Sequence, residues 1–245
     1  MKPFALLATR SEDVAADGEY EAFLEAGGLS PSDLVRFRLE SDPMPAIDPD
    51  DYSGFIVGGS PFNAGDPLST KTPTQVRVES ELSDLLDVVV ARDIPFLGAC
   101  YGIGLLGTHQ HGVVDHTWSE PVGPTLISIT EEGRADPLFG ALERSFAAFV
   151  GHKEACAVLP PNAVLLASGP NCPVQAFRIG QNVYATQFHP ELTVAGIVTR
   201  IRVYRDYGYF APEAMEELIA SVERVVVTEP TRLVAGFVQR YAQAG

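Results

Sequence analysis

Short apolar runs alternate with amphipathic stretches over the first hundred residues of the chain. Apolar runs at 4–8, 55–57 and 94–99, each bounded by polar or glycine-rich turns, predict buried β-strands. Between them, apolar residues at helical spacing predict helices over 20–26 and, most clearly, over 73–92. Buried strands that alternate with helices form parallel sheets covered on both faces, so this half predicts an α/β fold.

The pattern changes after residue 110, where short strands dominate. Further strands are expected at 125–129, 146–150, 164–167, 174–179 and 183–188. Gly180-Gln181-Asn182, between the last two, predicts a hairpin turn. Beyond Glu191 the helical spacing returns, over 194–204, 212–224 and 230–242.

Together these patterns predict one domain over residues 1–245, with a core of about 1–200 and a helical C-terminal extension of about 201–245. We expect a flavodoxin-like, doubly wound and mostly parallel sheet with helices on both faces. Alternating apolar and charged residues over 34–39 predict an edge strand. The sequence shows no internal repeat or linker.

Composition narrows the function. The 245 residues carry a formal net charge of -15, which repels nucleic acid and anionic membrane surfaces. The N-terminal apolar run is too short for a signal peptide, and no stretch approaches the ~18–20 apolar residues of a membrane span, so we expect a cytoplasmic protein. With only three cysteines in the chain, a disulfide framework is not expected, and Cys156 and Cys172 are interpreted as structural.

Cys100 lies where a strand meets a helix. The segment Gly98-Ala99-Cys100-Tyr101-Gly102 puts it in a tight turn flanked by glycines, which would project a nucleophile from the sheet edge. A helix beginning after Cys100 would lower the thiol pKa towards the reactive thiolate. The alternative interpretation is a small buried cysteine at the end of a strand.

His189-Pro190-Glu191 follows another expected strand. A thiol nucleophile needs an imidazole base, and the imidazole needs a group that fixes its tautomer. In extended structure Glu191 lies on the same side as His189, where it would orient the ring. The alternative is a surface histidine near the beginning of a helix, which leaves the pairing with Cys100 unexplained.

Gly58-Gly59, after the strand at 55–57, forms a third motif. Backbone N–H groups of this loop, together with the N–H of Tyr101, would bind an oxyanion. The alternative is a plain strand-to-helix turn.

These motifs resemble those of class I, triad-type glutamine amidotransferases, and the chain is most similar to the amidotransferase domain of GMP synthetase. That family carries a Gly-Gly-Pro/Ser loop, a Gly-x-Cys-x-Gly elbow and a late Phe/Trp-His-Pro-Glu in this order. The similarity spans roughly 54–191. It includes Gly58-Gly59-Ser60, Gly98–Gly102, Glu131–Pro137, Gly151–Glu154, Leu159-Pro160-Pro161 and Phe188–Glu191.

The resemblance implies a Cys-His-Glu triad. Cys100 would attack the side-chain amide of glutamine, His189 would transfer the proton, Glu191 would orient His189, and Gly59 and Tyr101 would hold the oxyanion. A γ-glutamyl thioester would form and be hydrolysed, releasing ammonia. The resemblance implies no cofactor and no metal.

Two departures from the family bear on the substrate. Gly104 stands where the family has a glutamine that holds the substrate; His109 and Gln110 are candidates to replace it, and the smaller residue suggests a roomier pocket. The ATP-pyrophosphatase domain of GMP synthetase is not found, and neither is a nucleotide-binding Gly-rich loop, so an ammonia acceptor is expected on a separate synthase subunit. Three functions stay open: a stand-alone glutamine-hydrolysing amidotransferase, a γ-glutamyl peptidase, and a non-catalytic regulatory subunit.

Two further clusters are weighed here. Tyr204, Tyr207, Tyr209 and Phe210 would cover the site, contact a partner or, as favoured, pack ordinarily. His109, His111 and His116 have the spacing of metal ligands, but no matching carboxylate or cysteine pattern follows, so no metal site is expected.

Overall fold

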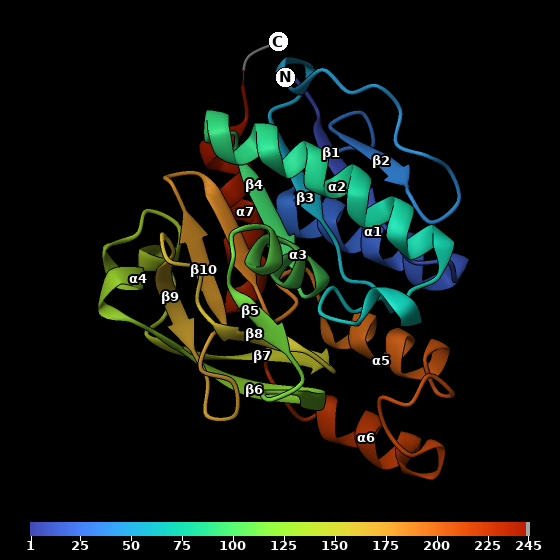
Figure 1. Cartoon of the computed structure of the whole chain (residues 1–245). Helices are drawn as coiled ribbons and strands as arrows, with labels where there is room; N and C mark the ends of the chain where they lie inside the picture. Colours follow the sequence, from blue (N-terminus) through green and yellow to red (C-terminus); the bar gives the residue numbers. More distant parts are fainter. Residues whose placement is uncertain (244–245) are drawn as a thin grey trace.

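A computed structural model describes residues 1–243, and within them one nine-stranded sheet runs through the molecule (Figure 1). Its strands lie in the order β2-β1-β3-β4-β11-β10-β9-β6-β7. In chain order they are β1 (Phe4–Ala8), β2 (Leu34–Arg38), β3 (Gly54–Val57), β4 (Phe96–Ala99), β6 (Glu120–Ile129), β7 (Ser145–His152), β9 (Val164–Ser168), β10 (Ala176–Ile179) and β11 (Val183–Thr186). A separate two-stranded sheet pairs β5 (Val113–Asp115) with β8 (Ala155–Val158).

The sheet has a parallel and an antiparallel part. From β2 to β11 all neighbouring strands pair parallel, whereas the pairs from β11 through β10, β9 and β6 to β7 are antiparallel. The expected α/β class with a mostly parallel central sheet is confirmed, and the strand expected at the edge, β2, does lie there.

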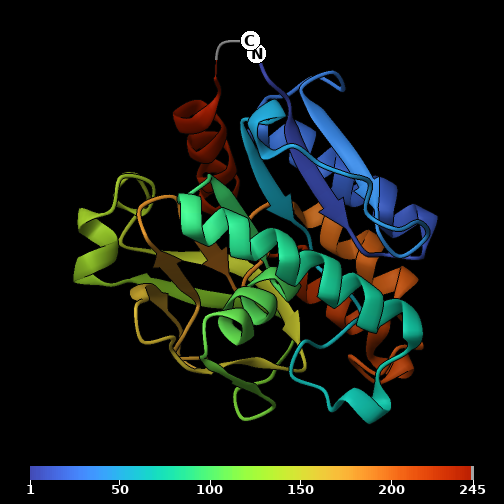
Figure 2. The same ribbon diagram turned by 45° about the horizontal axis from the view of Figure 1, so that its top comes forward.

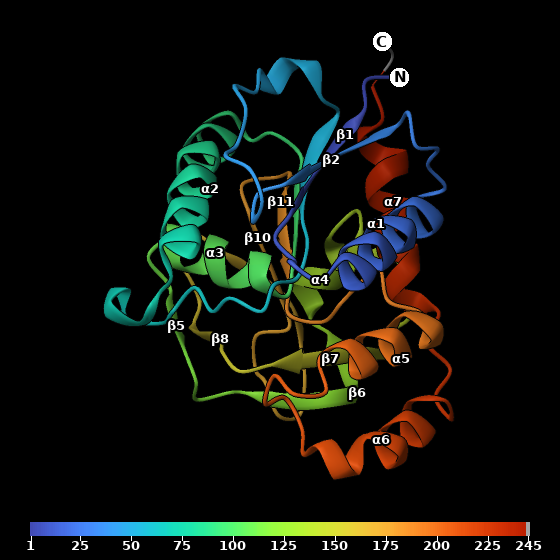
Figure 3. The same ribbon diagram turned by 90° about the vertical axis from the view of Figure 1, so that its right-hand side faces the viewer.

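Helices cover both faces of the sheet (Figures 2 and 3). They are α1 (Asp13–Gly27), α2 (Pro73–Arg92), α3 (Tyr101–His109), α4 (Glu131–Ala135), α5 (Val194–Val203), α6 (Met215–Val222) and α7 (Glu229–Tyr241), with 3-10 turns at Pro49–Asp51, Leu68–Thr70, Phe139–Ala141 and Pro212–Ala214. Figure 3 shows α2 and α3 on one side and α1 and α7 on the other, with α5 and α6 near β6 and β7. Among the helices of residues 1–243, none combines the length and the apolar character that crossing a membrane requires.

β1 shows how the sequence divides the core between the two faces. Phe4 and Leu6 pack into the cluster that includes residues of α1 and α7, whereas Ala5 and Leu7 pack into the cluster beneath α2. The helix α7 contributes five buried side chains to the first cluster: Leu233, Val234, Phe237, Val238 and Tyr241. It therefore forms part of the central core, and the chain ends meet where the Lys2 N–H donates to the Gln243 carbonyl (3.1 Å).

Most of the helices and strands expected from the hydrophobic pattern lie at the expected residues, and the exceptions have physical causes. α2 has the expected bounds, but α1 begins at Asp13 rather than residue 20 because the small residues Ala15 and Ala16 are buried as well. The short strands β5 and β8 were missed because they lie outside the main sheet, on edges with little alternation.

Candidate active site

Cys100 occupies a strained turn between β4 and α3. Its φ of 53° and ψ of −91° make it one of three non-glycine residues with positive φ among residues 1–243. Its N–H donates to the Thr186 carbonyl of β11 (2.8 Å). A Cβ on Gly98 would lie 2.8 Å from the carbonyl carbon of Gly102, so glycine is required for the helix to begin this close to the strand.

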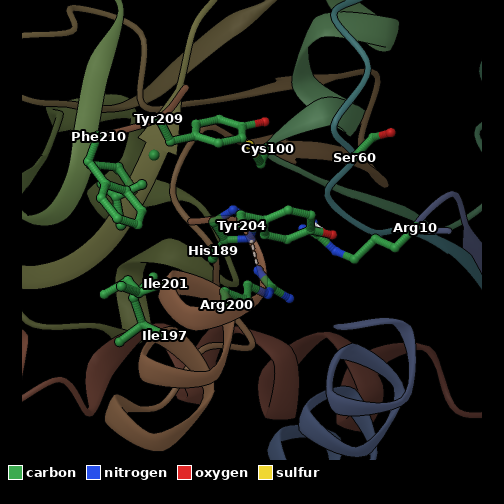
Figure 4. A pocket seen from close by; sticks show the side chains of 13 residues that line it. Arg10, Ser60, Cys100, His189, Ile197, Arg200, Ile201, Tyr204, Tyr209 and Phe210 are labelled. Atoms are coloured by element: carbon green, nitrogen blue, oxygen red, sulfur yellow. Dashed lines mark hydrogen bonds between the residues drawn. The ribbon is translucent and has the colours of Figure 1, made fainter. Parts of the chain in front are cut away.

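His189 lies just beyond β11 and faces the same cavity as Cys100 (Figure 4). Its ring Nδ1 lies 3.0 Å from Oε1 of Glu191, and both side chains are buried. Its backbone N–H donates to the Phe149 carbonyl of β7 (3.0 Å), which ties this turn to the neighbouring part of the sheet. The three residues expected to carry the chemistry are thus brought to one place.

A buried network of ion pairs surrounds His189 and was missed by sequence reasoning. Arg10 donates to Glu19 (Nε to Oε1, 2.9 Å), and Arg200 donates to both Glu19 (3.3 Å) and Glu191 (2.7 Å). These side chains come from the end of β1, from α1 and from α5, and all are almost fully buried. No local motif joins residues so far apart in the chain.

Arg200 competes with Glu191 for the same atom of His189. The Arg200 Nη1 lies 2.9 Å from the His189 Nδ1, which is also the atom facing Glu191. A guanidinium only donates and a carboxylate only accepts, so Nδ1 serves one partner at a time. When Nδ1–H donates to Glu191, Nε2 is free to accept a proton; when Nδ1 accepts from Arg200, the proton resides on Nε2. Only the first arrangement makes His189 a base towards the cavity.

Burial and neighbouring groups together set the protonation of the site. Burial lowers the pKa of His189, assisted by the nearby charge of Arg200 and opposed by Glu191, so the ring is neutral at neutral pH. Burial alone would raise the pKa of the Glu191 carboxyl, but the hydrogen bond from His189 and the charge of Arg200 outweigh it and hold that pKa below its ordinary value.

The thiol of Cys100 behaves differently from the expectation that the α3 N-terminus would lower its pKa. Burial raises the pKa of Cys100 to about 12, against the opposing charges of Arg10 and Arg200. That expectation is wrong because desolvation outweighs the helix terminus. At neutral pH Cys100 is therefore a neutral thiol, and it would have to lose its proton to a base in order to act as a nucleophile.

The expected oxyanion donors are differently placed. The N–H of Gly59 donates to Oε1 of Glu19 (3.0 Å), so in this arrangement it is not directed at the cavity as expected. A Cβ on Gly59 would lie 2.7 Å from the His189 Cε1, and one on Gly58 would collide with the Glu19 carboxylate, which explains the glycine pair sterically. Tyr101 begins α3, where backbone N–H groups have no partner within the helix.

Two cavities flank Cys100 and share Ser60, Gly151 and Tyr209. We call one the polar compartment; Asn63, Lys153, Glu154 and Gln187 are among the residues that line it. The other, the apolar compartment, is walled by Val122, Val150, Ile197, Ile201 and Phe210, with His189, Arg10 and Arg200 also at its surface. In Figure 4, Phe210, Ile197 and Ile201 gather on one side of this cavity, opposite Ser60 and Arg10.

Glu154 fills the space beside Gly104. A Cβ on Gly104 would lie 2.8 Å from Oε1 of Glu154, so the expectation of a roomier pocket at this position is wrong. The Glu154 carboxylate accepts the N–H groups of Ala64 (2.6 Å) and Gly65 (2.7 Å), and burial raises its pKa to about 7. The other candidates to replace the missing glutamine are engaged elsewhere: His109 bonds Asp87 and Gln110.

Two more features shape the polar compartment. The side-chain oxygen of Gln187 is buried and accepts no hydrogen bond from residues 1–243. Lys153 donates to the Tyr207 carbonyl (2.9 Å), and its ammonium lies 4.6 Å from the centre of the Tyr209 ring. The segment after α5 is thereby held over the site: Tyr204, Tyr209 and Phe210 all line the apolar compartment, rather than serving as core packing alone.

A buried cluster behind the polar compartment has the ligand types of a metal site. Atoms of Glu120, His152 and Cys172 lie within 4.8 Å of one another. The Glu120 carboxylate, however, already faces three partners: Thr125 (3.0 Å), His152 (3.1 Å) and Gln175 (2.6 Å). The other ring nitrogen of His152 lies 2.8 Å from the Glu154 carbonyl, so the cluster anchors the turn that carries Glu154.

Comparison with known proteins places this geometry in a family. Residues 34–196 match the family described as glutamine amidotransferase class-I. The glutamine-hydrolyzing GMP synthase of Oceanobacillus iheyensis is 26% identical over 162 residues, which cover 66% of this chain and 28% of that protein. For the enzyme of the same name from Parafrankia sp. the identity is 31% over 130 residues, covering 53% and 22%. The chain thus spans under a third of the length of these relatives.

Solved structures show the same fold over the whole chain. A glutamine amidotransferase from Thermotoga maritima superposes with a TM-score of 0.79 at 16% identity, covering 100% of both chains. The glutamine amido transferase from Methylobacillus flagellatus gives a TM-score of 0.71 at 21% identity, covering 100% of this chain and 97% of the other. The family match extends over well more than half of the residues, and the chain belongs to the class-I glutamine amidotransferase family.

Proposed function

We propose that this protein hydrolyses the γ-amide bond of glutamine, or of a related γ-glutamyl compound, with Cys100 as nucleophile. One observation carries the proposal: Cys100, on a strained elbow, shares a cavity with His189, whose Nδ1 lies 3.0 Å from Glu191. A non-catalytic protein of this fold has no need for that combination.

The reaction begins from a neutral thiol and a neutral imidazole. With Nδ1–H held by Glu191, the His189 Nε2 takes the thiol proton while the Cys100 sulfur attacks the γ-carbonyl carbon. The carbon–nitrogen bond then breaks, and the imidazolium gives its proton to the departing ammonia. Water attacks the γ-glutamyl thioester with His189 again as base, which yields glutamate and restores the thiol.

Positive charge close to the sulfur supports the attack. Arg10 and Arg200 both act to lower the pKa of Cys100 against the effect of burial, so they favour the charge that develops during proton transfer. The Tyr101 N–H at the beginning of α3 is the proposed donor to the oxyanion. Gly59 joins it once its N–H leaves Glu19, a small turn of the Gly58-Gly59 loop.

The polar compartment suits the amino-acid end of the substrate. The Glu154 carboxylate is an acceptor, and the buried oxygen of Gln187 is an acceptor with no partner among residues 1–243, so we assign both to the α-ammonium group. Lys153 is the cation in the same compartment and is assigned to the α-carboxylate. Glu154 thereby takes the place of the family's glutamine, which Gly104 lacks.

The nitrogen group that leaves the substrate is either ammonia or a substituted amine. The relatives named GMP synthase combine glutamine hydrolysis with a synthase in chains more than three times the length matched here, which supports delivery of ammonia to a separate synthase subunit. A γ-glutamyl peptidase would instead release an amine to solvent. The presence of a second, apolar compartment beside Cys100 favours this alternative.

Incubation with glutamine and mass spectrometry test the proposal. We expect glutamate and ammonia in equal amounts, and a single adduct on Cys100 after treatment with 6-diazo-5-oxo-L-norleucine. Cys100→Ala should lose both, whereas Cys156→Ala, which removes a thiol buried elsewhere, should keep them. Absence of the adduct together with absence of turnover of glutamine and of γ-glutamyl peptides would contradict the proposal.

A further inference from the structure

The two compartments beside Cys100 differ in polarity, and so do the two parts of a γ-glutamyl amide: the glutamyl part is charged, and the leaving amine can be apolar. The polar compartment offers acceptors and a cation for the glutamyl end. His189, the group that protonates the departing nitrogen, lies at the surface of the apolar compartment. Because an amine departs on the side of the acid that protonates it, the leaving group must enter the apolar compartment.

Ammonia makes little use of such a space. It is about the size of a water molecule, and a cavity needs about 10–15 Å³ of volume accessible to the centre of such a molecule to hold one. The apolar compartment offers about 40 Å³ of this volume, against about 20 Å³ in the polar one, so it has room for more than a single ammonia. Its walls of valine, isoleucine and phenylalanine offer no hydrogen bond to ammonia, but they favour carbon atoms attached to the nitrogen.

We propose that the physiological substrate is a γ-glutamyl amide whose leaving amine carries an apolar substituent of a few carbon atoms. This inference rests on the proposed function and names its substrate class. The substituent packs against Val122, Ile197 and Ile201, beneath Phe210.

The step balances as a hydrolysis. His189 protonates the amide nitrogen as the carbon–nitrogen bond breaks, and a neutral apolar amine departs. Water then cleaves the thioester, so that one amide and one water give glutamate and one amine. Arg10 and Arg200 lie at the surface of the compartment and repel a positively charged group on the substituent. This repulsion excludes diamines as leaving groups.

A series of γ-glutamyl amides tests the inference, with glutamate release by the full chain as the readout. It comprises glutamine and its N-methyl, N-ethyl, N-propyl and N-isobutyl derivatives. We expect kcat/KM to rise about three- to fourfold per carbon added. The ethanolamide, a polar match for the propylamide, and the 4-aminobutylamide should be poorer substrates. The dipeptide γ-glutamyl-leucine shows whether the source of the apolar group is an amino acid or a simple amine.

Two variants locate the effect. Val122 is only partly buried, at the margin of a core cluster, so replacements there disturb the core less than replacements of the buried Ile197 or Ile201. Val122→Phe should reduce kcat/KM for the isobutylamide at least tenfold more than for glutamine, and Val122→Thr should flatten the rise along the series. The control is Val113→Thr on β5, where the side chain is exposed and lines neither compartment, and the series should not change.

The outcomes separate this inference from the proposed function. If glutamine is the best substrate, or if Cys100 takes up the diazo-ketone but the substituted amides do not turn over, the inference is overturned and the nucleophile stands. If Cys100 is unlabelled and no γ-glutamyl compound turns over, both fail. A rise along the series that is equal in Val122→Phe would place the apolar contact elsewhere and overturn the assignment of this compartment.

Discussion

Cys100 and the charged side of the cavity are built in opposite ways. Cys100 is positioned by its immediate neighbours in sequence, since Gly98 and Gly102 let β4 pass directly into α3. The charged side is assembled from Arg10, Glu19 and Arg200, on three distant segments, and is held by buried ion pairs. In the proposed mechanism, the first arrangement supplies the reacting atom, and the second sets the proton positions of the atoms around it.

This difference explains why the turn at Cys100 does not by itself produce a reactive thiolate. The sharp turn projects the sulfur, but desolvation raises its pKa to about 12. In the proposed mechanism, the thiol therefore depends on His189 to take its proton. The tautomer of His189 in turn depends on whether Arg200 or Glu191 bonds its Nδ1. We infer that a substitution at Cys100 changes activity but not stability, whereas a substitution in the network of Arg10, Glu19 and Arg200 changes both.

The largest expected effect tests that separation at the elbow. Cys100→Ala should lower the rate of amide hydrolysis by a factor on the order of 10³ or more, because no nucleophile remains. Its midpoint of unfolding in urea should stay within a few tenths of a molar of the parent, since the small side chain makes no buried ion pair. A large loss of stability would show that the elbow, too, is structurally coupled.

Arg200→Met should affect both properties. It leaves Glu19 and Glu191 buried with one cation fewer, which costs about 3–5 kcal/mol of unfolding free energy. We expect kcat to fall roughly tenfold to a hundredfold as Glu191 loses its fixed position. Arg202→Met, at an exposed position of the same helix, is the matched control and should leave both measurements unchanged.

A smaller effect is expected in the polar compartment. Glu154→Gln should raise KM for glutamine roughly tenfold, because a charge-assisted contact to the α-ammonium becomes a neutral one. Glutaramate, which lacks the amino group, distinguishes recognition from structure: its turnover should hardly change. Equal losses for both compounds would make Glu154 a purely structural residue. Glu132→Gln, on the exposed surface of α4, controls for the loss of one charge.

The pH dependence of kcat/KM should show the smallest change. Activity needs His189 neutral, with a pKa lowered from 6.5, and Glu154 ionised, with a pKa of about 7. As the pH falls, both groups become protonated. Glu154 has the higher pKa and is protonated first, so the acid limb of the parent protein should be centred near pH 7. In Glu154→Gln the limb should move below pH 6.5. An unmoved limb would contradict the assignment of Glu154.

Much of the fold was readable from the sequence because it is encoded locally. β1 and α2 have the expected bounds, as each is a continuous apolar run or a regular stripe. The three motifs of the site were also visible, because each is a contiguous segment at the end of a strand.

The rest depends on contacts between distant segments. A charged residue such as Glu19 is expected at the surface, so its burial against Gly59 could not be predicted. Arg10 resembled an ordinary polar residue after a strand. The effect of Gly104 was misjudged because Glu154, fifty residues later, occupies the space it leaves. Sequence spacing indicates which residues are near in the chain, whereas desolvation and pKa depend on those that are near in space.

The place of α7 in the core has a consequence for the synthesis of the protein. Phe237 packs against Phe4, with ring centres 5.8 Å apart, so the first strand and the last helix complete the same cluster. During translation, the apolar side of β1 and α1 stays incompletely covered until residue 241 has left the ribosome. The nascent chain therefore exposes part of this apolar face for most of its elongation, and transiently exposed apolar surface makes a folding chain prone to aggregation.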